Sequence, residues 1–87
     1  MNHEKTFTIN GVQVKVKWME TEAAHSQKLN DTPITFIEAW VKKPGEREER
    51  DGYWSLGRWY DRPETAAAKQ AINQVIASRK GKETNQR

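Results

Sequence analysis

An Asn-Gly pair at residues 10–11 interrupts a run, residues 7–18, in which apolar and polar side chains alternate. Alternation with period two is typical of a strand with one buried face. Asn-Gly favours a two-residue type I′ turn, because both residues tolerate positive φ, and such a turn sets Ile9 opposite Val12. The sequence therefore predicts a β-hairpin with an apolar face and a polar face. The apolar face carries Phe7, Ile9, Val12, Val14, Val16 and Trp18, and the polar face carries Thr6, Thr8, Gln13, Lys15 and Lys17.

Residues 34–42 are rich in β-branched and aromatic side chains and predict a third strand. Two facings are open. If Phe36 and Trp40 point inward, Glu38 enters the core with them, and burying a charge is costly. The other facing, which we prefer, leaves both aromatic residues and Lys42 on the far side of the sheet. It buries Ile37, Ala39 and Val41.

The connecting segments are polar. Residues 20–33 predict a loop with at most one weak helix, closed by a turn that ends at Pro33. Residues 43–52 predict a highly charged loop led by a Pro-Gly pair. A fourth strand is expected from Tyr53 to Trp59, with Gly57 marking a bulge or a close approach of the helix.

A helix is predicted to follow, running to about Arg79 and ending at Gly81. Asp61 is the expected N-cap, Glu64 completes a capping box, and Pro63 is tolerated in the first turn. An apolar stripe at helical spacing would face the sheet. It consists of Ala68, Ala71, Ile72, Val75 and Ile76.

These elements predict an α+β fold: an antiparallel sheet of about four strands in two hairpins, with one C-terminal helix on one face (ββ-loop-ββα). A chain of 87 residues corresponds to one domain. We assign residues 1–80 to it and residues 81–87 to a flexible basic tail. Four tryptophans and two dense β-branched runs argue against disorder.

Composition narrows the functional classes. The chain has no cysteine, which excludes disulfides and thiolate metal sites. It has no apolar run near the roughly 20 residues of a membrane span and no apolar region at its N-terminus typical of a signal peptide. We therefore expect a cytoplasmic protein that does not enter membranes.

The inventory of reactive side chains predicts no enzyme. His3 and His25 are the only imidazoles, and we place them in the terminus and in a loop. No Ser-His-acid set or acid pair falls on regular elements, and no glycine-rich phosphate loop is present. The expectation is a non-catalytic binding protein with no metal and no cofactor.

A single helix covers one face of a sheet, so the other face is open to water or to a partner, unless the loop of residues 20–33 folds over it and packs on its aromatic residues. Cations interleaved with aromatic rings suit nucleic acid, and aromatic residues and arginine also anchor protein interfaces. The net charge of +3 is mild, and both readings stay open: a nucleic-acid binder, or a protein-binding module, an inhibitor or a homodimer. The predicted binding residues are Lys15, Lys17, Trp40, Lys42, Tyr53, Ser55 and Arg58, beside Phe36.

Residues 34–76 resemble the three-stranded-sheet-plus-helix DNA-binding domains, namely the ethylene-response-factor domain and the arm-site-binding domain of lambda-type integrases. The resemblance rests on the strand ending in Leu56-Gly57-Arg58, the helix start after Asp61 and the alanine-rich helix from Ala66. It implies that the face away from the helix binds the major groove of double-stranded DNA through Trp40, Lys42, Tyr53, Ser55 and Arg58. It also implies a small factor of the kind encoded by phages or mobile elements. Glu38 and the acidic segment 46–51 depart from the more arginine-rich family pattern.

Overall fold

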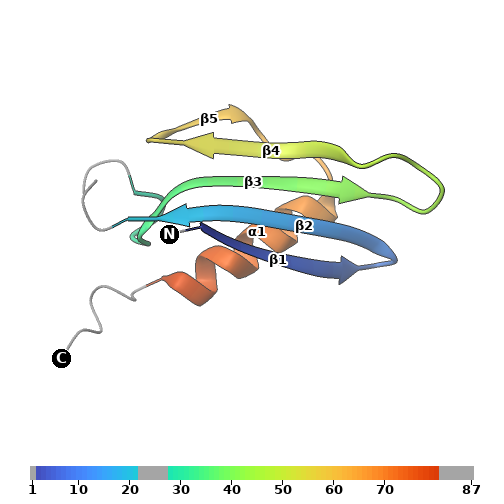
Figure 1. The fold of residues 1–87 in the computed structure, drawn as a ribbon, viewed down its shortest axis with the longest axis horizontal. Helices are drawn as coiled ribbons and strands as arrows, with labels where there is room; N and C mark the ends of the chain where they lie inside the picture. The colour runs from blue at the N-terminus through green and yellow to red at the C-terminus, as the bar shows by residue number, and fades with distance from the viewer. Residues whose placement is uncertain (1, 22–27, 81–87) are drawn as a thin grey trace.

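The computed structural model describes residues 2–21 and 28–80, which form one antiparallel sheet and one helix (Figure 1). The five strands lie side by side in chain order: β1 (Asn2–Ile9), β2 (Val12–Glu20), β3 (Ile34–Lys42), β4 (Glu49–Ser55) and β5 (Arg58–Asp61). Helix α1 (Ala66–Arg79) crosses one face, behind β1, β2 and β3 in the view of Figure 1. The predicted α+β class is confirmed, and the sheet has one strand more than expected.

The first hairpin has the predicted turn and register. Asn10 and Gly11 adopt φ angles of 53° and 77°, and both lie in the left-handed region that a type I′ turn requires. Ile9 pairs with Val12 and Phe7 with Val14. The alternation therefore turns the apolar side chains of β2 into the core, where Val14 and Val16 are fully buried.

Strand β3 has the preferred facing. Its inward residues, Ile37, Ala39 and Val41, are at most 5% exposed. Phe36, Glu38 and Trp40 lie on the opposite face, where they are half-buried. The cost of burying the Glu38 carboxylate decides this facing, as the sequence indicated.

The predicted fourth strand, residues 53–59, is wrong: these residues form a second tight hairpin. Leu56 and Gly57 adopt φ angles of 46° and 98° and make the turn between β4 and β5. The Leu56 amide donates to the Thr35 carbonyl at 3.1 Å, which ties the turn to β3. The hairpin sets Trp54 opposite Trp59, so that both indoles pack against the core.

The predicted charged loop is shorter than expected, because residues 49–52 belong to β4. The close approach of the helix occurs there, at Gly52, and not at Gly57. A Cβ atom on Gly52 would lie 3.0 Å from the Cδ1 atom of Ile72, and the φ angle of Gly52 is 132°. The backbone conformation therefore favours glycine at this position, and any side chain there would have to push the end of Ile72 aside by a few tenths of an ångström.

The helix starts later than predicted. Asp61 ends β5, and the N-cap is Thr65, whose Oγ1 atom accepts a hydrogen bond from the Ala68 amide at 3.2 Å. Asp51 of β4 takes the role expected of an acidic cap, as its carboxylate accepts hydrogen bonds from the backbone of Glu64 and Thr65. The predicted apolar stripe is confirmed. Its buried residues are Ala67, Ala68, Ala71, Ile72, Val75 and Ile76.

Two predictions fall partly outside the described residues. The predicted helix end at Gly81 and the tail 81–87 lie outside them. So do residues 22–27, which include His25 and part of the proposed weak helix. The described end of that segment contributes to the core. Leu29 is 6% exposed, and the buried Thr32 hydroxyl donates to the Leu29 carbonyl at 2.6 Å.

A polar cluster joins the end of the helix to the edge of the sheet. The Arg79 guanidinium donates to the Glu20 carboxylate at 2.8 Å, and the Trp18 indole N–H donates to it at 2.8 Å. His3 lies in β1 and not in an irregular terminus, and its ring stacks on Trp18 with centroids 5.2 Å apart. Burial raises the pKa of Glu20, but the hydrogen bonds from Arg79 and Trp18 and the charges of Arg79 and His3 hold it below its usual value.

Replacing Glu20 with glutamine is expected to lower the free energy of unfolding at neutral pH by roughly 0.5–1.5 kcal/mol. The folded pKa of Glu20 is depressed, so its contribution is complete above the ordinary glutamate pKa of about 4.3. It is lost as the pH falls through the lower folded value. Urea unfolding of both proteins between pH 7 and pH 3 measures this. A stability difference that stays constant over that range would contradict the prediction.

Candidate binding face

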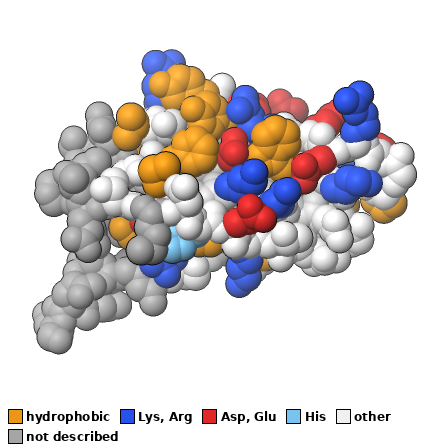
Figure 2. All heavy atoms as spheres, viewed as in Figure 1, with side chains coloured by type: hydrophobic (Ala, Val, Ile, Leu, Met, Phe, Trp, Pro, Cys, Tyr) orange, Lys and Arg blue, Asp and Glu red, His pale blue; other side chains and the backbone are white. Residues whose placement is uncertain are grey.

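The surface of the sheet opposite α1, which we name the open face, has no helix over it in the described part of the chain (Figure 2). Strand register assigns its residues, since side chains alternate between the two faces. Each strand from β2 to β5 contributes charged or aromatic side chains. They are Lys15, Lys17 and Met19 from β2; Phe36, Glu38, Trp40 and Lys42 from β3; Arg50, Tyr53 and Ser55 from β4; and Arg58 and Tyr60 from β5.

The register brings all the predicted binding residues onto this one face. Lys15 lies opposite Trp40, and Ser55 lies opposite both Phe36 and Arg58. Sequence reasoning missed Arg50 and Tyr60, because it placed one in a loop and the other between a strand and a helix. The signal that could have found them was Leu56-Gly57 as a hairpin turn, which makes strands of the segments on either side.

Three rings form a row across β3, β4 and β5, which we name the aromatic row: Phe36, Tyr53 and Tyr60. Phe36 meets Tyr53 edge to face with centroids 5.5 Å apart, and Tyr53 stacks on Tyr60 at 5.2 Å. The Cζ atom of Arg50 lies 4.7 Å from the Tyr53 centroid, and that of Arg58 lies 4.8 Å from the Tyr60 centroid. Tyr60 is 58% exposed, so the row ends on a ring that is open to solvent.

The cations of the open face differ in how far they are neutralised. Lys15 lies 3.7 Å from Glu48, and Arg50 lies 3.9 Å from Glu38. Within the part of the chain that the structure describes, Lys17 and Lys42 have no ion pair, and neither does Arg58. Lys17 stands on β2 next to Phe36, and Arg58 stands on β5 over the Tyr60 ring, whereas Lys42 lies at the other end of β3, opposite Gln13.

A hollow of 510 Å³ lies on the open face next to this row. Phe36 lies in both the row and the hollow, and Met19 adds a second apolar side chain to the lining. Lys17 supplies a cation at the same place, and the carboxylates of Glu4 and Glu38 lie opposite it on the neighbouring strands. The hollow thus combines an apolar surface with one cation and two carboxylates, which are the elements of a site for a flat polar ligand.

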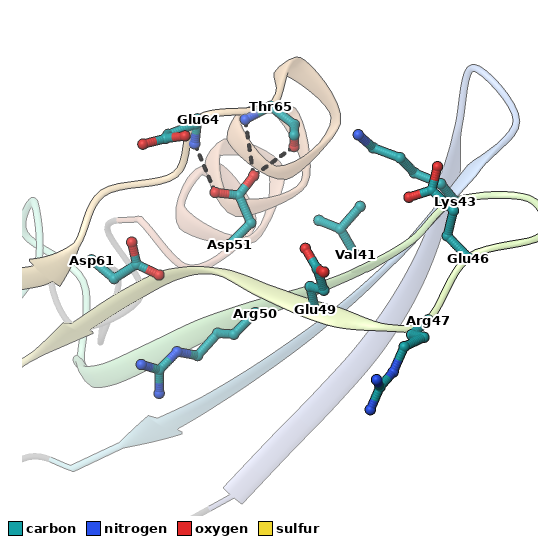
Figure 3. A pocket seen from close by; sticks show the side chains of 10 residues that line it. All are labelled: Val41, Lys43, Glu46, Arg47, Glu49, Arg50, Asp51, Asp61, Glu64 and Thr65. Atoms are coloured by element: carbon teal, nitrogen blue, oxygen red, sulfur yellow. Dashed lines mark hydrogen bonds between the residues drawn. The ribbon is translucent and has the colours of Figure 1, made fainter.

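A second hollow, of 330 Å³, lies between the β3–β4 turn and the start of α1 (Figure 3). Charged side chains of both signs line it. Lys43, Glu46 and Arg47 belong to the turn. Asp51 is occupied by hydrogen bonds to Glu64 and Thr65, drawn as dashed lines in Figure 3. These contacts join β4 to the helix, so we assign this hollow to the structure of the helix start and not to a ligand.

No group of three or more histidine, cysteine, aspartate or glutamate side chains that could hold a metal ion occurs among residues 2–21 and 28–80. In the same residues, no helix is long and apolar enough to cross a membrane. His3 packs on Trp18 beside Glu20 and faces no serine or second acid in the contacts described above. Comparison with protein-family models, with curated proteins and with solved structures found no match for this chain.

Proposed function

We propose that the protein is a non-catalytic nucleic-acid-binding protein that uses its open face. The observation that carries this proposal is the combination, on a single uncovered surface, of cations without ion pairs and a row of rings that is half-buried at Phe36 and Tyr53 and exposed at Tyr60. Cations attract phosphates in any sequence, and flat rings accept bases by stacking. The proposal extends the DNA-binding role that the resemblance of residues 34–76 implies.

The arginines strengthen this assignment through their position. Arg50 and Arg58 lie over the rings of Tyr53 and Tyr60 at 4.7 and 4.8 Å. A guanidinium held against a ring is confined to a few orientations, so less freedom is lost when it pairs with a phosphate. Planar, charge-assisted hydrogen bonds from arginine are well matched to phosphate oxygens.

Charge replacement on the open face is expected to change the salt dependence of binding. Lys17→Ala and Lys42→Ala should each weaken binding to a labelled oligonucleotide and reduce the slope of log K against log salt by about one unit. The physical reason is that each lost phosphate contact releases one counterion fewer. Fluorescence anisotropy titrations with duplex and single-stranded DNA over a range of salt concentrations measure both effects.

Lys69→Ala is the matched control, since it removes the same charge from the exposed side of α1. It should leave the slope close to that of the wild-type protein. If the wild-type protein binds neither form of DNA at low salt and tens of micromolar protein, the proposed function is refuted. An equal reduction of the slope of log K against log salt in all three variants would mean that the phosphate contacts are not made by the open face.

A protein partner is the second candidate, and three exposed apolar side chains favour it. Leu56 and Tyr60 at the β4–β5 hairpin are 55% and 58% exposed, and Met19 is 40% exposed. Aromatic residues, methionine and arginine are enriched in protein interfaces. In this reading the protein is a binding module or inhibitor, of phage or mobile-element type, that docks on a host protein or on a second copy.

Affinity capture from a nuclease-treated lysate separates the two candidates. A stoichiometric protein that is retained by the wild-type chain and lost with Leu56→Asp would support the protein partner. Sedimentation of the purified chain tests self-association in the same way. Loss of all bound material after nuclease treatment would favour nucleic acid.

A further inference from the structure

The width of the open face limits the form of nucleic acid that it can bind. Neighbouring strands of a sheet lie about 4.8 Å apart, so the five strands span about 19 Å. The major groove of B-DNA is about 12 Å wide and admits a helix or a narrow β-ribbon. The face as a whole therefore does not enter the groove, and only a part of it as narrow as β3, β4 and β5, about 10 Å across, could do so.

The aromatic row is built to meet unpaired bases. Its rings come from three adjacent strands and form one continuous series, with Tyr53 between Phe36 and Tyr60. Bases in a duplex already stack on their neighbours, whereas bases of a single strand can stack on a protein ring. Tyr60 is the most exposed ring of the row, but Tyr53 stacks on it and the Arg58 guanidinium lies over it. A base would therefore stack on Tyr60 by taking the place of the guanidinium, which stays close enough to pair with a phosphate.

The hollow beside Phe36 continues the row toward β2 and β1. Its volume of 510 Å³ falls in the range typical of small-ligand sites, about 300–1,000 Å³, and so has room for a base with its sugar. Lys17 stands at this hollow, opposite Glu4 on β1 and Glu38 on β3, and makes no ion pair within 4 Å among the described residues. Glu38 is also there, and a carboxylate accepts hydrogen bonds from the exocyclic amino group of a base. A surface that binds duplex DNA would not favour this carboxylate, whereas binding of an unpaired base gives it a role as a hydrogen-bond acceptor.

We propose that the open face selects single-stranded nucleic acid, laid across β5, β4 and β3 with bases on the aromatic row and one base in the hollow beside Phe36. The proposal rests on the proposed function and adds to it the strand form that is bound. Tyr60 is the residue at which the two forms of ligand are best distinguished, because its ring is exposed and would have no role in gripping duplex phosphates.

Anisotropy titrations of the full chain with one labelled oligonucleotide, single-stranded or annealed to its complement, test this. The single strand is expected to bind at least tenfold more tightly than the duplex. Tyr60→Leu should weaken single-strand binding by about tenfold, as one stacking contact is lost, and should leave duplex binding nearly unchanged. Tyr60→Phe keeps the ring and should retain the wild-type affinity.

Thermal melting of both Tyr60 variants controls for folding, which an exposed side chain should hardly affect. Duplex binding as tight as single-strand binding would overturn the proposed strand form and leave nucleic-acid binding in place. So would a Tyr60→Leu variant that melts normally and binds the single strand like the wild type. Binding to neither form would refute the proposed function as well as this inference.

Discussion

Replacing Ile72 with alanine is expected to lower the free energy of unfolding by about 2–5 kcal/mol, the usual cost of removing a buried isoleucine side chain. Ile72 is 2% exposed, and its Cδ1 atom packs against the backbone of Gly52 on β4. The truncation leaves a cavity between helix and sheet that neither can easily fill. In a domain of this size the loss should lower the melting temperature by roughly 10 °C or more.

Leu56→Ala is the control, and the sequence alone would not have chosen it. Leu56 falls within the strand predicted from Tyr53 to Trp59, but it is 55% exposed in the β4–β5 turn. Its truncation should change the stability by no more than about 0.5 kcal/mol. Calorimetry on both variants measures this difference. An equal loss of stability in the two proteins would contradict the exposed position of Leu56 in the β4–β5 turn.

Replacing Asp51 with alanine is expected to cost about 1.5–3 kcal/mol, because hydrogen bonds to a charged acceptor are lost together. The carboxylate accepts from the Glu64 amide at 2.8 Å, the Thr65 amide at 2.9 Å and the Thr65 hydroxyl at 2.7 Å. Without it, two amides at the start of the helix lose their partner, and β4 loses its link to α1. Urea unfolding at neutral pH measures the effect.

Two comparisons identify the cause of that loss. Asp51→Asn keeps one acceptor oxygen and should recover part of the stability, whereas Glu49→Ala on the same strand removes an exposed carboxylate and should have little effect.

Burial raises the pKa of Asp51, but the hydrogen bonds from Thr65 and Glu64 and the charge of Lys43 hold it below its usual value. The stabilisation should therefore be complete above the ordinary aspartate pKa of about 3.9 and be lost as the pH falls through the folded value. A loss in Asp51→Ala that persists at pH 2 would contradict this explanation.

The helix start shows how a local signal can be assigned to the wrong residue. Asp61 and Glu64 have the spacing of a capping box, and this pattern placed the N-cap four residues too early. The acidic group that serves the helix comes from Asp51, which is distant in sequence and reaches the helix only because β4 begins beside the helix start. Propensity describes neighbours along the chain and carries no information about such a contact.

The open face was only partly accessible to sequence reasoning. Alternation in β2 and the cost of burying Glu38 were enough to place Lys15, Lys17, Trp40 and Lys42 on it. Arg50 and Tyr60 were missed, and with them the contacts that hold arginines over tyrosines. Their position depends on the Leu56-Gly57 turn, in which a leucine adopts a positive φ that it disfavours by about 1–2 kcal/mol.

The sequence by itself determined the features that depend on short-range periodicity, namely the Asn10-Gly11 hairpin with its register and the apolar stripe of α1, and it favoured one of the two facings of β3. Each follows from neighbours two to four residues apart, whose relation is set by strand or helix geometry. Only the tertiary structure decided the β4–β5 hairpin, the close approach at Gly52 and the role of Asp51. These features depend on contacts between residues that are distant in sequence, such as the packing of Trp54 and Trp59 on the core. The energy of that packing exceeds the local conformational preference of the residues involved.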